Sequence, residues 1–329
     1  MSFAPAALAR TADEKYEDLR GLWADLETAL ALLLSAPLQM PNFSTKLRQL
    51  DRWLQDLVAQ DSDAALFLMF QLAADSTVGY SASHALVSAT LCQVLAQELG
   101  LPAHERQALV SAAFTMNIAM TQLQDQLALQ REPPSSAQQA QILRHPLESQ
   151  ALLLRLFVED PLWLEIVAAH HAQPPAAAPL AQLSPPVRLA RILASIDRYA
   201  AMISPRKSRG GRSATDSVRA IVGSELAGQD EVGYALVRTV GLWPPGTLVR
   251  LDNGDIAVVL RRSSQAHHPL VARVLNAAGR SYATPALHDT ARSAPRIQAA
   301  LARSGLAQQI APQTLALLGV YVGRSSPAH

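Results

Sequence analysis

The chain has 329 residues, of which 49% are hydrophobic and 17% charged; this supplies enough apolar surface for a folded core and excludes an intrinsically disordered protein. The formal net charge of +1 argues against nucleic acid or an anionic membrane as a bulk partner, and we expect neither. The length favours one large domain with a smaller one beside it.

Residues 1–60 are expected to form an N-terminal helical extension. Apolar residues recur at helical spacing over 11–34 and the pattern stops before Pro37; a second helical pattern covers 44–58. Such an extension either wraps over the main core or serves as an adaptor or dimerisation region. The pattern favours neither alternative.

Residues 61–240 carry helical patterns almost throughout and no alternating strand pattern, which predicts an all-helical domain. Gly100, Pro102 and the Pro133-Pro134 pair punctuate these patterns. The helices are expected at 63–73, 82–99, 103–128, 136–144, 147–157, 160–171, 185–203, 213–222 and 231–240.

Residues 241–329 change to strand-like patterns and predict a small antiparallel β appendage, so the fold class is mainly α. Asn253-Gly254 is expected to supply the positive φ angles of a tight hairpin turn. Two short helices after Ala294 are expected to close the chain. The strands are expected at 247–251, 255–260, 271–275 and 281–284.

A cytoplasmic location is expected from the cysteine usage and the apolar runs. Cys92 is the single cysteine, which excludes an internal disulfide framework and suits a reducing compartment; its apolar helical surroundings predict a buried, unreactive thiol. The chain does not open with a signal-peptide pattern, and its apolar runs fall short of the roughly 20 residues that span a bilayer.

Five short motifs between residues 80 and 246 bring together histidines and a carboxylate. The motifs are Tyr80-Ser81-Ala82-Ser83-His84, Met116-Asn117-Ile118-Ala119-Met120, His145-Pro146-Leu147-Glu148-Ser149, His170-His171, and the run from Ala190 to Tyr199 that contains Asp197. In their order and spacing they resemble the HD-GYP domain family of HD-superfamily metal-dependent phosphohydrolases, whose members act as cyclic di-GMP phosphodiesterases. The resemblance implies an HD-superfamily helical bundle and covers a little over half of the chain.

The resemblance implies two adjacent metal sites, and the first is degenerate in this chain. The family's HDxGK motif reads Met116-Asn117-Ile118-Ala119-Met120, so a thioether replaces the metal-binding imidazole and a neutral amide replaces the bridging carboxylate. Met120 replaces the lysine of the motif. Of this site only His84 and Asp197 remain, and we expect it to be empty.

The second implied site retains His145, His170 and His171, with Asn117 as a weak fourth ligand. Three imidazoles suffice for one divalent ion, which would be Fe, Mn or Zn. The alternative is that these histidines are packed, hydrogen-bonded core groups and that the protein binds no metal. The sequence leaves both open.

The resemblance also implies that Arg206 and Arg209 contact the phosphates of cyclic di-GMP, a role that suits the bidentate guanidinium. The alternative is a solvated basic loop. The Gly-Tyr-Pro loop that should follow His171 lacks its glycines and its tyrosine, and only Pro179 matches.

We therefore expect a degenerate HD-GYP-type protein without cyclic di-GMP phosphodiesterase activity, and we assign no catalytic residue. It would act in bacterial signalling by binding cyclic di-GMP, another protein, or a second copy through the N-terminal helices. The alternative is an active phosphohydrolase that uses one metal ion on the three histidines, with Asp197 or His84 moving protons.

Overall fold

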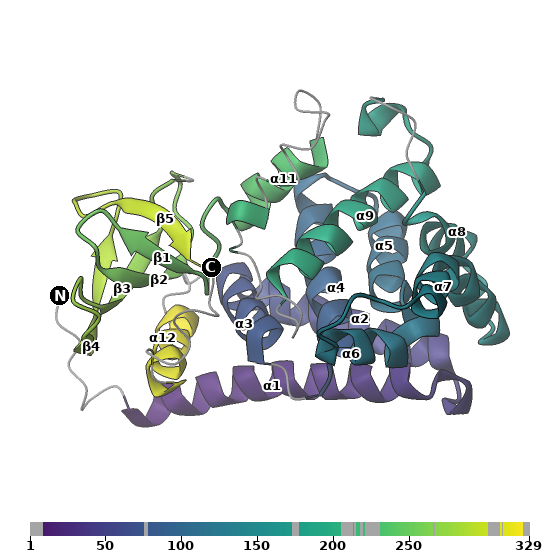
Figure 1. Ribbon diagram of the computed structural model, residues 1–329, viewed down its shortest axis with the longest axis horizontal. Coiled ribbons are helices and arrows are strands. Elements are labelled where there is room, and N and C mark those ends of the chain that lie inside the picture. The colour runs from purple at the N-terminus through teal and green to yellow at the C-terminus, as the bar shows by residue number, and fades with distance from the viewer. Residues whose placement is uncertain are drawn as a thin grey trace.

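The protein is mainly helical, with a small C-terminal antiparallel sheet, as expected from the sequence (Figure 1). The helical bundle occupies one end of the molecule and the sheet the other. The computed structural model describes residues 9–75, 78–172, 178–204, 213, 215–217, 220, 231–265, 267–301, 310 and 312–324.

The predicted helices over 185–203 and 231–240 are confirmed residue for residue, whereas the one expected over 213–222 lies mostly outside the described residues. Within the described ranges, no helix is both long enough and apolar enough to cross a membrane. The α-helices are α1 (Ala9–Ser35), α2 (Phe43–Gln60), α3 (Ser62–Asp75), α4 (Tyr80–Glu98), α5 (Ala103–Thr115), α6 (Thr121–Leu129), α7 (Ser136–Arg155), α8 (Pro161–Ala169), α9 (Pro185–Ile203), α11 (Glu231–Val240) and α12 (Pro312–Arg324).

Helix α4 is the centre of the bundle, because every residue from Ser81 to Ala96 is buried and α3, α5 and α9 pack around it. A helix that is apolar on all sides is expected in this position. Its first turn is held by Asp125 of α6, whose carboxylate accepts hydrogen bonds from the Ser81 amide (2.7 Å) and hydroxyl (3.0 Å). Cys92 lies in this helix and is buried, as predicted, and burial raises the pKa of its thiol.

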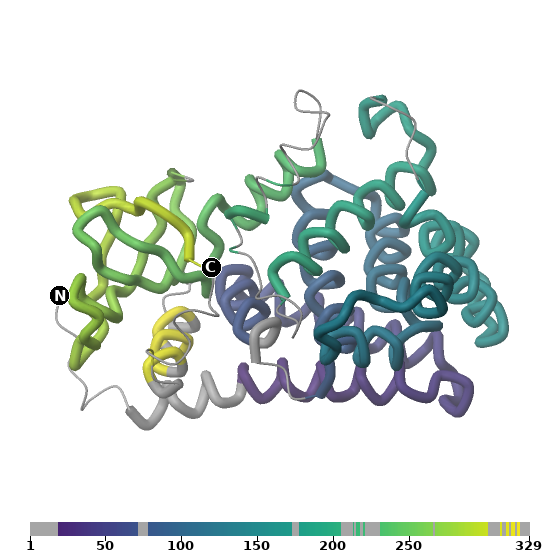
Figure 2. Tube along the Cα trace, in the orientation of Figure 1, coloured from purple at the N-terminus to yellow at the C-terminus, as the bar shows by residue number. Residues whose placement is uncertain are grey.

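Helices α1 and α2 pack against this bundle. Trp23 and Leu30 of α1 and Leu47 and Leu54 of α2 are buried in the same apolar cluster as the side chains of α4, α5 and α9. Figure 2 shows α1, in purple, running along one side of the bundle. This packing is that of a helical wrap, one of the two alternatives that the sequence left open. The role as an adaptor or dimerisation region and the domain boundaries at residues 60 and 240 stay predictions.

The helix predicted over 103–128 is wrong as one continuous element. It is divided into α5 and α6 by a 3-10 turn at Ile118–Met120, because Asn117 (φ −106°, ψ 14°) leaves the helical conformation. The two helices predicted at 136–144 and 147–157 are in fact one helix, α7, which keeps Pro146 inside it. Proline removes one backbone donor there, and the side chain of the neighbouring His145 supplies a donor in its place.

The sheet has the strand order β4-β3-β2-β1-β5, with all neighbours antiparallel. One face packs on α12 and on Phe67 of α3. Arg262, directly after β2, forms an ion pair with Asp63 of α3 (2.5 Å), and Arg261, the last residue of β2, bonds Asp61. These two ion pairs join the sheet to the bundle. The strands are β1 (Leu248–Leu251), β2 (Ile256–Arg261), β3 (Leu270–Leu275), β4 (Ser281–Asp289) and β5 (Ile297–Leu301).

One of the two helices expected after Ala294 is present as α12, but strand β5, which precedes it and pairs with β1, was not predicted. The prediction for the β1–β2 turn is only partly right. The β1–β2 turn has three residues: the Gly254 amide bonds the Leu251 carbonyl, and only Gly254 (φ 86°), not Asn253, has a positive φ. This is a type I turn followed by a left-handed glycine, the usual form of a three-residue hairpin.

Candidate metal centre

His145 lies in the middle of α7, and the proline that follows it fixes the orientation of its ring. Pro146 has no N–H to donate to the carbonyl four residues earlier, that of Ile142. His145 Nδ1 takes this place and donates to the Ile142 oxygen at 2.5 Å. The Ile142 carbonyl thus keeps a hydrogen-bond donor although Pro146 has none. Because the ring proton is on Nδ1, Nε2 of His145 is an unprotonated acceptor.

His170 and His171 follow the last turn of α8. This helix is started by Asp160, whose carboxylate accepts from the amides of Leu162 and Trp163. At its other end His170 Nδ1 donates to the carbonyl of Val167 at 2.7 Å, one of the carbonyls that a helix end leaves free. His170 Nε2 is therefore an acceptor as well.

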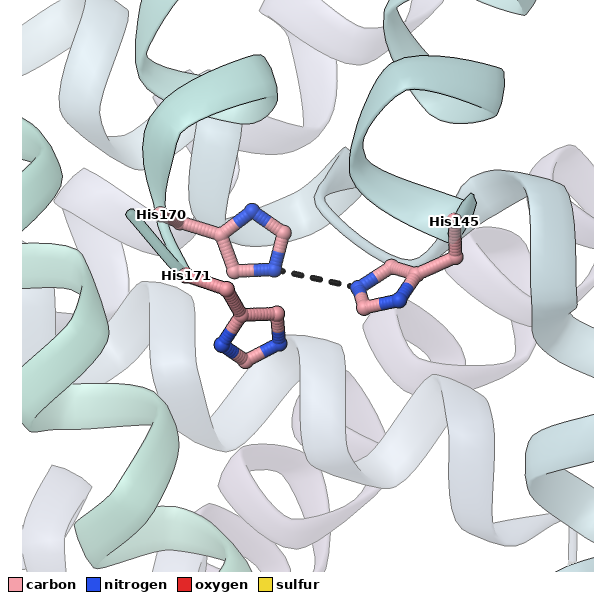
Figure 3. Close-up of side chains that lie close together, drawn as sticks. All are labelled: His145, His170 and His171. Carbon is pink, nitrogen blue, oxygen red and sulfur yellow. Dashed lines mark hydrogen bonds between the residues drawn. The ribbon is translucent and has the colours of Figure 1, made fainter. Parts of the chain in front are cut away.

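Figure 3 shows the three rings turned toward one another. The Nε2 atoms of His145 and His170 are 3.2 Å apart, and one ligand atom from each of the three histidines lies within 4.8 Å of the other two. The ring centroids of His170 and His171 are 4.2 Å apart. His145 and His170 are fully buried, whereas His171 is exposed, so the cluster opens to solvent on one side only.

The neutral state of the two buried rings, His145 and His170, favours a cation between them. Burial lowers the pKa of His145 and His170, that of His170 to about 4, so both are neutral at pH 7. Their Nε2 lone pairs then face each other. Nitrogen ligands of a tetrahedral zinc ion, each about 2.0–2.1 Å from the metal, are themselves about 3.3 Å apart. The donor set and its spacing therefore fit one divalent ion.

His84 of α4 and Asp197 of α9 form the other polar group of this region. His84 Nε2 and Asp197 Oδ1 are 2.8 Å apart, and the Tyr80 ring stacks on the His84 ring at 5.6 Å. Burial acts to raise the pKa of Asp197, but the His84 hydrogen bond and the nearby imidazoles outweigh it and hold the carboxyl far below its usual range. The aspartate is thus a fixed negative charge facing the histidine cluster.

The segment from Met116 to Met120 follows α5. Met116 is 1% exposed and belongs to the main apolar core. Asn117 is partly buried, and its proposed role as a fourth ligand stays a prediction. Met120 lines a cleft of about 620 Å³ beside Arg144 and Glu148. The Ser149 hydroxyl accepts from the Ala119 amide at 3.3 Å and ties this turn to α7.

The structure thus brings His145, His170 and His171 together and pairs His84 with Asp197. Arg206 and Arg209 lie outside the described residues. Sequence reasoning missed the carbonyls of Ile142 and Val167 as partners of the histidines. The His145-Pro146 dipeptide could have indicated the Ile142 carbonyl, because a proline inside a helix leaves the carbonyl four residues earlier without its amide donor.

Comparison with known proteins finds one distant curated relative. Over 192 residues the chain is 26% identical to a cyclic di-GMP phosphodiesterase of Pseudomonas aeruginosa, a match that covers 57% of this chain and 46% of that protein. The chain spans about half the length of the curated relative it matches. No family model matches the chain, and no solved structure matches it. The match shows a distant similarity to that phosphodiesterase.

Proposed function

We propose that this distant relative of a cyclic di-GMP phosphodiesterase is a signalling protein that binds one divalent metal ion through His145, His170 and His171. The observation that carries the proposal is the pair of neutral imidazoles whose Nε2 atoms face each other at 3.2 Å. Two opposed, buried lone pairs are unfavourable unless a cation lies between them. Bound there, the ion would act as a Lewis acid toward an oxygen ligand.

The proposed activity is binding of cyclic di-GMP and not its hydrolysis. Two-metal hydrolysis needs a second cation beside the first, and its ligands are missing here. Met116 stands in the apolar core where the resemblance expects an imidazole, and Asn117 brings no charge for a bridge. His84 and Asp197 bond each other, and two protein ligands are too few for tight binding of a second ion.

A second candidate is residual phosphodiester hydrolysis with one metal. The observation that favours it is the ionised Asp197, whose low pKa reflects the proximity of His84, His170 and His171. A carboxylate paired with a histidine beside a metal site is suited to hold or move a proton. The cytoplasmic location expected from the single cysteine remains part of this proposal for both candidates.

The first test is elemental mass spectrometry of untagged protein purified without chelators. About one ion per chain supports the proposal, and a content near zero contradicts it. Calorimetric titration with cyclic di-GMP then tests the ligand, with His170→Ala as the variant and His104→Ala, an exposed histidine, as its control. Turnover of cyclic di-GMP by the wild type above the level of His170→Ala would favour the hydrolytic candidate.

A further inference from the structure

Helix α7 has apolar residues on both of its faces. Its inner face buries His145, Ser149 and Leu153 in the bundle. Its outer face exposes Leu143 (81%), Leu147 (64%) and Leu154 (55%). These leucines are four and seven residues apart, so they form one stripe along the helix, with the exposed Ala151 between them. The helix lies at the end of the molecule opposite the sheet (Figure 1).

Phe157, directly after α7, extends this stripe in an unusual backbone conformation. Its φ is 58° and it is 86% exposed. The Val158 amide bonds the Leu153 carbonyl (3.1 Å) and the Phe157 amide bonds the Leu154 carbonyl (3.0 Å), the hydrogen bonds of a Schellman motif. Glycine is preferred at this left-handed position, where a bulky side chain is strained. The phenyl ring gains almost no burial within this chain in return.

The charges beside the stripe complement those of a second, antiparallel α7. Glu148 and Arg155 are both exposed and lie seven residues apart, two helical turns, on the same flank of the leucines. Within its own helix Glu148 also accepts from the exposed Arg144 (3.0 Å), a solvent-exposed pair that leaves its second oxygen available to another copy. In a two-fold pair of helices the same patch meets itself in reverse order. If the axis passes near Ala151, Glu148 of each copy faces Arg155 of the other, and the small alanine allows close approach.

We propose that the outer face of α7 is a homodimer interface, in which Leu143, Leu147, Leu154 and Phe157 pack against the same residues of a second copy. The strained, exposed phenylalanine then acts as an anchor that is buried only on association. Each copy contributes a single helix, so the area that it buries is smaller than the roughly 800 Å² per partner of a stable complex. The dimer is therefore weak and concentration-dependent. It is independent of the metal site and of the proposed function.

Sedimentation velocity from about 1 to about 200 μM tests the proposal, because small interfaces associate in this range. We expect a monomer–dimer equilibrium for the wild type and at least a tenfold weakening by Leu147→Glu. The control is Leu129→Glu, an equally exposed leucine (63%) at the end of α6. A wild type that stays monomeric throughout, or a dimer that Leu147→Glu leaves intact, overturns the proposal.

Charge exchange tests the antiparallel arrangement. Glu148→Arg or Arg155→Glu alone creates like charges across the interface and weakens the dimer several-fold, whereas the double exchange restores it. Failure of the double variant to recover contradicts the arrangement. Phe157→Gly provides a readout that a purely structural residue would not give: the monomer melts at a higher temperature while the dimer weakens. Unchanged association in this variant contradicts the anchor.

Discussion

The two polar groups at the centre of the bundle differ in what their side chains bond. His145 and His170 each donate a ring N–H to a backbone carbonyl that no amide of the helix uses, so their other nitrogens are held toward one point. In the other group His84 and Asp197 bond each other, and Met116 lies in the apolar core. The backbone thus orients each ring of the first group toward a shared point, whereas the second group is a closed pair.

Removal of one member of the histidine cluster should abolish metal binding. His170→Ala leaves two imidazoles, and we expect metal content to fall to near zero and metal affinity to drop at least about 100-fold. Elemental analysis and calorimetry measure both. His104→Ala, on an exposed residue, should bind metal like the wild type. Retention of the ion by His170→Ala would place the metal elsewhere.

The converse change introduces metal-binding side chains at Met116 and Asn117. In Met116→His with Asn117→Asp, the new side chains stand at the motif positions of the resembled family beside His84 and Asp197. We expect metal content to rise from one ion to two, with a lower melting temperature because a polar ring enters the core. The matched control is Met69→His, a methionine of α3 that is equally buried at 1% exposure. Two ions in the control as well would refute the assigned positions.

Lowering the pH should reduce the unfolding free energy of the metal-free protein, because burial keeps His170 neutral in the folded state. The pKa of His170 falls from its ordinary 6.5 to about 4 in the folded state, through burial first and the neighbouring His171 second. Between these values the unfolded chain binds the proton and the folded chain does not. The metal-free protein should therefore lose on the order of 3 kcal/mol of unfolding free energy as pH falls from 6.5 to 4.

Urea denaturation of the metal-free protein at a series of pH values measures this loss. In His170→Ala the dependence should be flatter over the same window, since the titrating ring is gone. Equal slopes for the two proteins would mean that His170 accepts its proton normally in the folded state.

The smallest effect concerns the proline that orients His145. In Pro146→Ala the new amide competes with His145 Nδ1 for the Ile142 carbonyl, and the ring loses its fixed tautomer. We expect metal affinity to fall about tenfold while the helix remains folded. Pro185→Ala, at the start of α9, is the control. Unchanged affinity in calorimetry would show that the hydrogen bond does not position the ring.

The fold was largely predictable, and the errors have local causes. Helix α9 was predicted to the residue, because its apolar pattern begins after Ser184 at a proline pair and continues to Ile203 without interruption. The break at Asn117 was missed since no glycine or proline marks it. The continuity of α7 was missed because a proline usually ends a helix, and here a side chain supplies the missing partner of Ile142.

The sequence alone determined the helical class, the set of candidate histidines and the uncharged side chains at Met116 and Asn117, because spacing and side-chain chemistry are local properties. Only the tertiary structure decided that Nε2 atoms of residues 25 apart in the chain meet at 3.2 Å, and that β5 returns to pair with β1. A helical period fixes which face a side chain occupies. The point where two faces meet depends on long-range packing, such as the Trp163 ring nitrogen bonding Thr115 at 2.8 Å to hold α8 on α5.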